Sequence, residues 1–414
     1  MHEIMVSIVC LTYNQGFFIK DAIESFLKQK TKFPIEIIVH DDASTDGTTE
    51  IIKEYVKKYP EIIVPIFQKD NQYNICRIFP KYVLPKVRGK YIALCDGDDY
   101  WTDSMKLQLQ VEFMEKHNEC TLTMHNATSV RYDNGEKKVL NTFTESGFYN
   151  QREQVISGLG SVFPACASML FRSEIMKQIP DFFLKPKAID YSLRQYCAIK
   201  GKVYYDKRNM SVYRVATPKS FMKMTNENTE FYAEYTIEMI EFFNRFNEYT
   251  NFSFKDIMEQ KIISDYLGYC CVIEREIGIA KQKGMDIDTL KKCYEYISPI
   301  NISKNIIKLY KKCKQVYIYG TGRLALVCSK QMEEHNMEIC GYVVSDSQFK
   351  NDLFNGKKIY YLSELREKIS AGFILGVQPI NTQSVITELE RQNLLNYCEF
   401  YSLQNERGEN NENM

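Results

Sequence analysis

The chain has 414 residues, of which 44% are hydrophobic and 26% are charged, and this balance is typical of a folded globular protein. Lys plus Arg and Asp plus Glu each number 53, so no excess charge favours binding to nucleic acid or to an anionic membrane. A single hydrophobic core rarely covers a chain of this length, which predicts two domains with a smaller helical unit between them.

The N-terminal segment lacks the basic stretch and the long apolar region of a signal peptide, and no window approaches about 18 consecutive apolar residues. We therefore expect a cytoplasmic protein. The chain has 13 Cys and no C-x-x-C pair, and the adjacent Cys270 and Cys271 match no zinc-binding spacing. Reduced and mostly buried thiols are the expectation.

Strand and helix patterns alternate over roughly the first 130 residues. Apolar runs predict buried strands at 4–11, 35–40, 62–67 and 90–95. Pro65 indicates that the third of these is an edge strand or carries a bulge. Helical spacing predicts one helix at 17–29 and another whose N-cap is Ser44, Thr45 or Asp46. Strands that alternate with helices predict a parallel sheet with helices on both faces.

The rest of the chain divides by pattern. Mixed strand signals from about 120 to 215 continue the first α/β domain, which we place at 1–220. Long helical patterns then predict a connector over 221–312. Strands and helices alternate again over 313–404, which predicts a second, smaller α/β domain. The polar residues 405–414 are expected to be disordered.

Three predicted strands end in polar segments: "TYN" (12–14), "DDASTDGT" (41–48) and "DGDDYW" (96–101). In an open parallel sheet, ligands bind outside the carboxyl ends of the strands. One acidic turn would be weak evidence, but three polar strand ends at one edge predict a binding site there.

The third of these segments contains three carboxylates. Side chains two residues apart in an extended segment point the same way, so Asp96 and Asp98 can face one ligand while Asp99 points elsewhere. Oxygen ligands without a neighbouring cation favour Mg²⁺ or Mn²⁺. The alternative is a cluster that caps the helix predicted after Asp103, a role that Asp103 can fill by itself.

Taken together, "VSIVCLTYN", "DDASTDGT" and "GKYIALCDGDDYW" resemble the nucleotide-binding half of family 2 glycosyltransferases with the GT-A fold. The resemblance covers roughly residues 4–216 and implies a nucleotide-diphosphate sugar, usually a UDP-sugar, as donor. It places Thr12, Tyr13 and Asn14 around the base and ribose. Asp42 would accept the uracil N3–H, Asp96 would bond the ribose side, and Asp98 would bind the divalent cation.

The resemblance also implies residues around the diphosphate and the acceptor. Arg77 corresponds to a diphosphate-contacting Arg of some relatives, and a surface Arg is the alternative. Asp190 resembles the general base, with a helix N-cap as the alternative reading. The positions implied on the acceptor or diphosphate side are Trp101, Ser168, Arg172 and Arg214.

One position departs from the family pattern. Many relatives have a His shortly after a Tyr-Arg pair, but "VYRVATPKS" has Tyr213 and Arg214 without that His. Lys219 or Ser220 is a candidate for the missing phosphate contact. The family pattern near the metal or the diphosphate is therefore incomplete in this sequence.

The second domain contains a G-x-G-x-x-A pattern at Gly320, Gly322 and Ala325, between a predicted strand and a predicted helix. Asp346 follows at the end of the next strand. The domain resembles the small Rossmann-like modules of bacterial sugar-modifying enzymes. Binding of an anionic ligand at the Gly-rich turn and a purely structural or dimerising role are both open.

A basic amphipathic segment at 303–314 precedes this domain. It is interpreted as an interdomain packing helix, while contact with an anionic membrane, at the inner face, is the alternative and would suit a lipid-linked acceptor. Homo-oligomerisation also stays open.

The function we expect is that of an inverting glycosyltransferase that uses a divalent cation and transfers a sugar from a UDP-sugar to a hydroxyl acceptor, in bacterial surface-glycan synthesis. The alternatives are a nucleotide-sugar-binding protein without turnover and an NAD-dependent oxidoreductase centred on Gly320.

Overall fold

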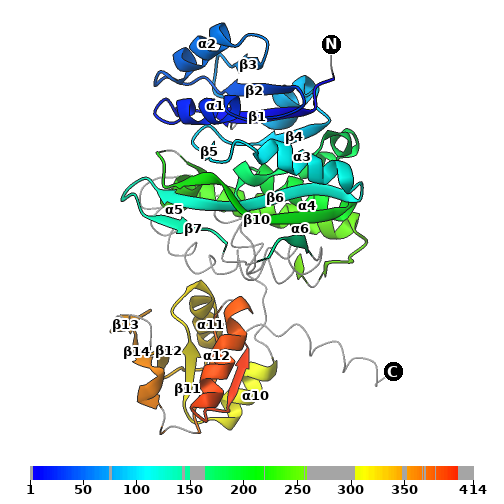
Figure 1. Ribbon diagram of the computed structural model, residues 1–414. Helices are drawn as coiled ribbons and strands as arrows, with labels where there is room; N and C mark the ends of the chain where they lie inside the picture. The colour runs from blue at the N-terminus through cyan, green and yellow to red at the C-terminus, as the bar shows by residue number, and fades with distance from the viewer. Residues whose placement is uncertain are drawn as a thin grey trace. The chain divides into compact units, whose positions relative to one another are not determined.

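The computed structural model describes residues 3–73, 77–141, 145–149, 164–218, 220–255, 257–258, 304–346, 352–365, 367, 370–377 and 379–399. The chain separates into two compact units, and the division falls between Phe246 and Asn247. Each unit has its own sheet (Figure 1). Each unit also has its own hydrophobic core. The division lies inside the segment that the sequence assigns to a connector.

The first unit is built on a sheet with the strand order β3-β2-β1-β4-β9-β6-β10-β5. Four parallel strands form one half of it: β1 (Val6–Thr12), β2 (Ile35–Asp41), β3 (Ile63–Phe67) and β4 (Tyr91–Leu94). They correspond to the predicted strands, and β3, which contains Pro65, lies at the sheet edge as predicted.

The other half of this sheet is mixed. Its strands are β9 (Leu170–Arg172), β6 (Cys120–Arg131), β10 (Lys202–Val215) and β5 (Tyr100–Trp101), with β7 (Lys137–Val139) and β8 (Gly147–Tyr149) paired to β6 and β10. β9 is antiparallel to both β4 and β6, so the sheet is not parallel throughout.

Helices of the first unit are α1 (Ile19–Leu27), α2 (Thr48–Lys58), α3 (Lys106–Lys116), α4 (Ile189–Lys200), α5 (Phe221–Glu227) and α6 (Thr229–Tyr249). The N-cap of α2 is Gly47 and not one of the predicted polar residues. Gly47 has a φ of 93°, a left-handed conformation that glycine adopts without steric cost. Asp46 instead accepts a hydrogen bond from the Thr48 amide at 3.2 Å.

The second unit contains a sheet with the order β13-β14-β12-β11-β15-β16. Its strands are β11 (Val316–Tyr319), β12 (Gly341–Val344), β13 (Leu353–Phe354), β14 (Lys357–Tyr361), β15 (Gly372–Leu375) and β16 (Tyr397–Glu399). All pairs are parallel except β13 with β14. Its helices are α10 (Lys304–Lys312), α11 (Arg323–Glu334) and α12 (Pro379–Arg391). A 3-10 helix, Leu362–Leu365, follows β14.

The basic amphipathic segment forms α10. Its apolar residues Ile306 and Leu309 are buried in the core of the second unit together with Cys313. The apolar face that would enter a membrane is therefore part of this core. Among the residues that the structure describes, no helix is long and apolar enough to cross a bilayer. The cysteines in the same ranges are all free, and most are buried, as predicted.

Candidate active site

The three polar strand ends of the first unit meet at one edge of its sheet. The Asp42 amide donates to the Thr12 carbonyl at 3.0 Å, and the Gly97 amide donates to the Leu11 carbonyl at 2.9 Å. The segments after β2 and β4 are thus both bonded to the end of β1. This is the side-by-side arrangement that the parallel register requires.

The turn after β1 is fixed to the turn after β2. Asn14 has a φ of 52°, its amide donates to Ser44 Oγ at 2.8 Å, and its Oδ1 accepts from the Thr45 amide at 2.8 Å. Thr12 is buried, whereas Tyr13 is 37% exposed. The Tyr13 ring therefore presents an accessible aromatic surface beside the end of β2.

Asp42 is 2% exposed and lies below the loop that follows β3. Its Oδ1 accepts from the Gln72 amide at 2.8 Å and its Oδ2 accepts from the Tyr73 amide at 3.1 Å. Burial raises the pKa of Asp42, and the hydrogen bonds from the Gln72 and Tyr73 amides counteract this rise. A carboxylate has about four lone-pair sites, so Asp42 can accept a further N–H donor.

The segment after β4 turns sharply, with the Asp99 amide bonded to the Asp96 carbonyl at 3.0 Å. Asp96 and Asp98 are partly exposed, whereas Asp99 is 2% exposed. Asp99 accepts from the Arg214 amide at 2.8 Å. The turn therefore presents two carboxylates at the edge and uses the third to hold the segment against β10.

Burial and the charges of Asp98 and Asp190 raise the pKa of Asp96 to about 7, while a hydrogen bond from the Cys166 thiol opposes the rise. Burial also raises the pKa of Asp98. Burial raises the pKa of the Tyr213 hydroxyl, and so do the charges of Asp99, Asp190, Asp98 and Asp96. The pKa of this one hydroxyl thus responds to four carboxylates from two segments.

Asp190 lies in the first turn of α4, whose N-cap residue is Ala188. Burial raises the pKa of Asp190, and the Arg194 charge opposes this rise. The charge of Asp190 raises the pKa of Asp96 although the two residues are far apart in sequence.

Thr217 is a site residue that the sequence analysis missed. Its hydroxyl donates to Asp98 Oδ2 at 2.7 Å, and it lies in the segment where relatives of this type have a His. Ser220 accepts from the Lys223 amide at 3.4 Å as the N-cap of α5, and Lys219 lies outside the described residues. The sequence signal that could have identified Thr217 was its hydroxyl, three residues after Arg214 in "VYRVATPKS".

Arg214 connects the same turn to α1. Its guanidinium donates to the Asp98 carbonyl at 2.7 Å and to Asp21 Oδ2 at 2.5 Å, and it lies 4.6 Å from the centroid of the Tyr100 ring. Arg77 also has a carboxylate partner, because its guanidinium donates to Glu238 Oε1 at 2.6 Å.

Three residues expected on the acceptor side use their polar groups inside the fold. Trp101 donates to the Ala167 carbonyl at 2.8 Å, and the Ser168 hydroxyl donates to the Ala165 carbonyl at 2.7 Å. Arg172 is 7% exposed and donates to backbone carbonyls of Cys120 and Met114. The polar groups of Trp101, Ser168 and Arg172 are thus bonded within the fold, and their expected role on the acceptor or diphosphate side stays a prediction.

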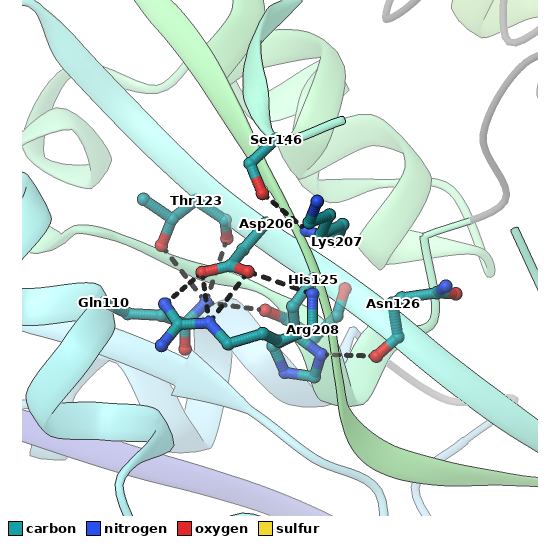
Figure 2. Close-up of polar contacts among 9 residues, drawn as sticks. Gln110, Thr123, His125, Asn126, Ser146, Asp206, Lys207 and Arg208 are labelled. Atoms are coloured by element: carbon teal, nitrogen blue, oxygen red, sulfur yellow. Dashed lines mark hydrogen bonds and ion pairs between the residues drawn. The ribbon is translucent and has the colours of Figure 1, made fainter. Parts of the chain in front are cut away.

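A layer of buried polar side chains lies next to these supports. Lys106 is fully buried, with its Nζ 2.8 Å from Gln110 Oε1 and 4.1 Å from the centroid of the Trp101 ring. Figure 2 shows that Gln110 of α3 reaches Thr123 of β6, where Nε2 donates to Oγ1 at 3.2 Å. In the same view His125 Nδ1 lies 2.8 Å from the Asn126 carbonyl.

In the second unit, Gly320 follows β11 and Gly322 is the N-cap of α11. Gly320 has a φ of 110°, which L side chains rarely adopt. Ala325 is buried, and Asp346 Oδ1 accepts from the Ser363 amide at 2.9 Å. The predicted strand-turn-helix context of the G-x-G-x-x-A pattern is present.

Residues 7–179 match the family model described as Glycosyl transferase family 2. An uncharacterized protein of Mycobacterium tuberculosis is 36% identical over 213 residues, which are 50% of this chain and 58% of that protein. The UDP-Glc:alpha-D-GlcNAc-diphosphoundecaprenol beta-1,3-glucosyltransferase WfaP of Escherichia coli is 32% identical over 160 residues, which are 39% of this chain and 52% of that protein. The chain thus spans little more than half the length of these relatives.

A crystal structure of S. aureus TarS in complex with UDP-GlcNAc is similar to this chain with a TM-score of 0.44 and 17% identity, over 72% of this chain and 93% of that chain. Residues 7–179 are thus similar to this family, and the match together with the mixed α/β sheet assigns the GT-A fold to the first unit. The matched family and WfaP are glycosyltransferases.

Proposed function

We propose that the chain transfers a sugar from a nucleotide-diphosphate donor, with UDP as the nucleotide, to a hydroxyl acceptor, and that the anomeric configuration is inverted. The observation that supports this proposal is that the segments carrying Asp42, Asp96 and Asp98 are bonded to the end of β1, with the charge of Asp190 acting on Asp96. Inversion follows from the single base candidate, because one direct displacement needs one base.

The donor would bind along the ends of β1, β2 and β4. Asp42 would accept the uracil N3–H with the lone pairs that Gln72 and Tyr73 leave available. Cytosine has no proton at N3, so this carboxylate favours uracil. Thr12, Tyr13 and Asn14 would flank the base and ribose, and Asp96 would bond the ribose. Arg77 and Arg214 are the cations proposed for the diphosphate side.

A divalent cation fits the residues at this edge. Burial and neighbouring carboxylates raise the pKa of Asp96, so added positive charge would relieve a repulsion that the fold maintains. Asp98 would hold Mn²⁺ or Mg²⁺ together with donor phosphates, as such ions are held elsewhere by one or two carboxylates. The bound ion would neutralise charge on the departing diphosphate.

Asp190 would act as the base. The acceptor oxygen bonds to the anomeric carbon, the bond from that carbon to the diphosphate oxygen breaks, and the acceptor proton goes to the Asp190 carboxylate. Burial raises the pKa of Asp190, and this makes it a stronger base than an exposed aspartate. The acceptor is proposed to be a surface glycan or its lipid-linked precursor, by analogy with the substrate in the name of WfaP.

The test combines a panel of nucleotide sugars, with and without Mn²⁺, with two site variants. We expect one UDP-sugar to turn over. Asp98→Ala should weaken Mn²⁺-dependent UDP binding by about tenfold or more, since it removes the protein ligand of the ion. Asp190→Asn should retain UDP binding and lose about 10²–10⁴-fold in transfer.

Asp133→Asn is the matched control, because Asp133 is an exposed carboxylate paired with Arg131. It should behave like wild type. The proposal fails if no nucleotide sugar binds and if Asp98→Ala and Asp190→Asn cannot be told apart from this control.

A further inference from the structure

Glu238 of α6 is bonded to two segments of the candidate active site. It lies C-terminal to the segment that matches the family model. Its side chain is 24% exposed and contacts Arg77 on the donor side and Lys187 just before Asp190. The two segments are far apart in sequence, and each of them contributes a residue with a proposed role in transfer.

On the donor side, Glu238 Oε1 accepts from Arg77 at 2.6 Å. The Tyr73 ring stacks on Phe231, also on α6, with the centroids 6.4 Å apart. The amide of the same Tyr73 is bonded to Asp42. Helix α6 thus contacts Tyr73, whose amide is bonded to the proposed uracil-binding carboxylate.

On the base side, Glu238 Oε2 accepts from the Lys187 amide at 3.0 Å, and Lys187 Nζ lies 3.3 Å from Glu238 Oε1. The Lys187 side chain is only 6% exposed, and its Nζ lies 5.2 Å from the centroid of the Phe231 ring. Glu238 therefore fixes both the backbone and the side chain of the residue that leads into the first turn of α4, where Asp190 lies.

We propose that Glu238 is a positioning residue that couples the donor loop to the base-bearing helix. The proposal rests on the proposed transferase function. One carboxylate accepts a charge-assisted hydrogen bond from the Arg77 guanidinium and a hydrogen bond from the Lys187 amide, and it forms an ion pair with the Lys187 ammonium. Movement of one segment therefore changes the geometry of the other. Donor binding at Asp42 would in this way align Asp190 with the acceptor.

Glu238→Gln is the test variant because it keeps the size of the side chain and removes its charge. Glu234→Gln is the matched control on the same helix. Glu234 contacts Lys187 Nζ at 2.9 Å and is 46% exposed. In the described part of the chain the partner of Glu234 is Lys187 and not Arg77, so E234Q should leave the coupling intact. Both variants are compared with wild type below their unfolding midpoints, which are measured by circular dichroism.

The first readout is UDP affinity by calorimetry in MnCl₂ together with kcat for transfer. We expect E238Q to weaken UDP binding several-fold and to lower kcat by about tenfold or more, since small misplacements of reacting groups are costly. E234Q should stay within about twofold of wild type for both quantities. The proposal is overturned if E238Q matches E234Q, or if E238Q binds UDP more tightly, because Glu238 would then compete with the donor for Arg77.

The second readout is amide hydrogen exchange of the protein without ligand. E238Q should speed exchange at the Gln72 and Tyr73 amides and also in the first turn of α4, while E234Q should do so at neither place. Faster exchange at one place only, or at neither, contradicts the coupling. This readout does not need activity: a wild type that binds no UDP would refute the proposed function, and the exchange pattern would still decide the role of Glu238.

Discussion

Lys106 is a basic side chain enclosed by the core beneath the candidate site. Burial lowers its pKa to about 7, and the neighbouring Cys95 and Cys166 thiols oppose this shift. Between about pH 7 and the unfolded value near 10.4, the unfolded chain binds a proton that the folded chain does not bind. The free energy of unfolding should therefore rise with pH in this window, and below about pH 7 the full penalty of burying the charge applies.

Lys106→Met removes this penalty and keeps an unbranched side chain over Trp101. We expect it to raise the free energy of unfolding at pH 6 by roughly 1–4 kcal/mol, and the advantage over wild type should shrink toward pH 10. The fluorescence of Trp101, the one Trp of the chain, reports urea unfolding of the first unit. Lys116→Met is the control, because Lys116 is exposed. If the free energy of unfolding changed with pH in the same way for wild type and for Lys106→Met, this account would be contradicted.

Several site residues could be predicted because their chemistry is local. Asp42, Asp96 and Asp98 follow apolar strands directly, and the strand ends of a parallel sheet share one edge. Trp101 follows these carboxylates directly and Arg172 lies on β9, and both side chains are buried in the fold. Their orientation depends on carbonyl groups of distant residues, and sequence spacing does not reveal such partners.

At the scale of elements, the pairing of β1 with β4 requires a glycine just before β4. A Cβ on Gly89 would lie 2.4 Å from the Ser7 nitrogen and 2.8 Å from the Val6 carbonyl carbon, and these backbone atoms belong to β1 and cannot yield independently. The Gly89 amide also donates to Ser7 Oγ at 2.8 Å. A side chain at position 89 would therefore push β4 away from β1, and the ends of these two strands carry the candidate site.

Gly89→Ala should lower the free energy of unfolding of the first unit by about 2–4 kcal/mol, since overpacking against backbone has no cheap relief. Gly147→Ala on β8 is the control: a Cβ there has no neighbour within 4 Å, and the change should stay within about 0.5 kcal/mol. Trp101 fluorescence in urea measures both variants. Equal urea midpoints for Gly89→Ala and Gly147→Ala would contradict this prediction, because the strands would then adjust to a side chain at position 89.

The helical elements show where local pattern stops being informative. Helices α5 and α6 have the amphipathic spacing that predicts a connector, yet the residues up to Phe246 belong to the first unit. Their packing partners, such as Arg77 for Glu238, lie far away in the sequence. Periodicity predicts that a helix has an apolar face but not which surface covers that face.

At the scale of the whole molecule, the sequence predicted two α/β parts, and both sheets are present. The alternation of strands and helices carried this prediction for each part. The antiparallel β9 was not foreseen, because a three-residue strand gives no topological signal. The boundaries proposed at 220 and 312 remain predictions, since residues 259–303 lie outside the described ranges.

The most direct test of the central claim is a crystal structure of the full chain with UDP and MnCl₂. The account predicts the uracil ring against Asp42 and Tyr13, with N3 within hydrogen-bonding distance of the Asp42 carboxylate. It also predicts the diphosphate beside Asp98, with Mn²⁺ bound to that carboxylate. Nucleotide density at the Gly320–Gly322 turn of the second unit, with none at the edge formed by β1, β2 and β4, would contradict it.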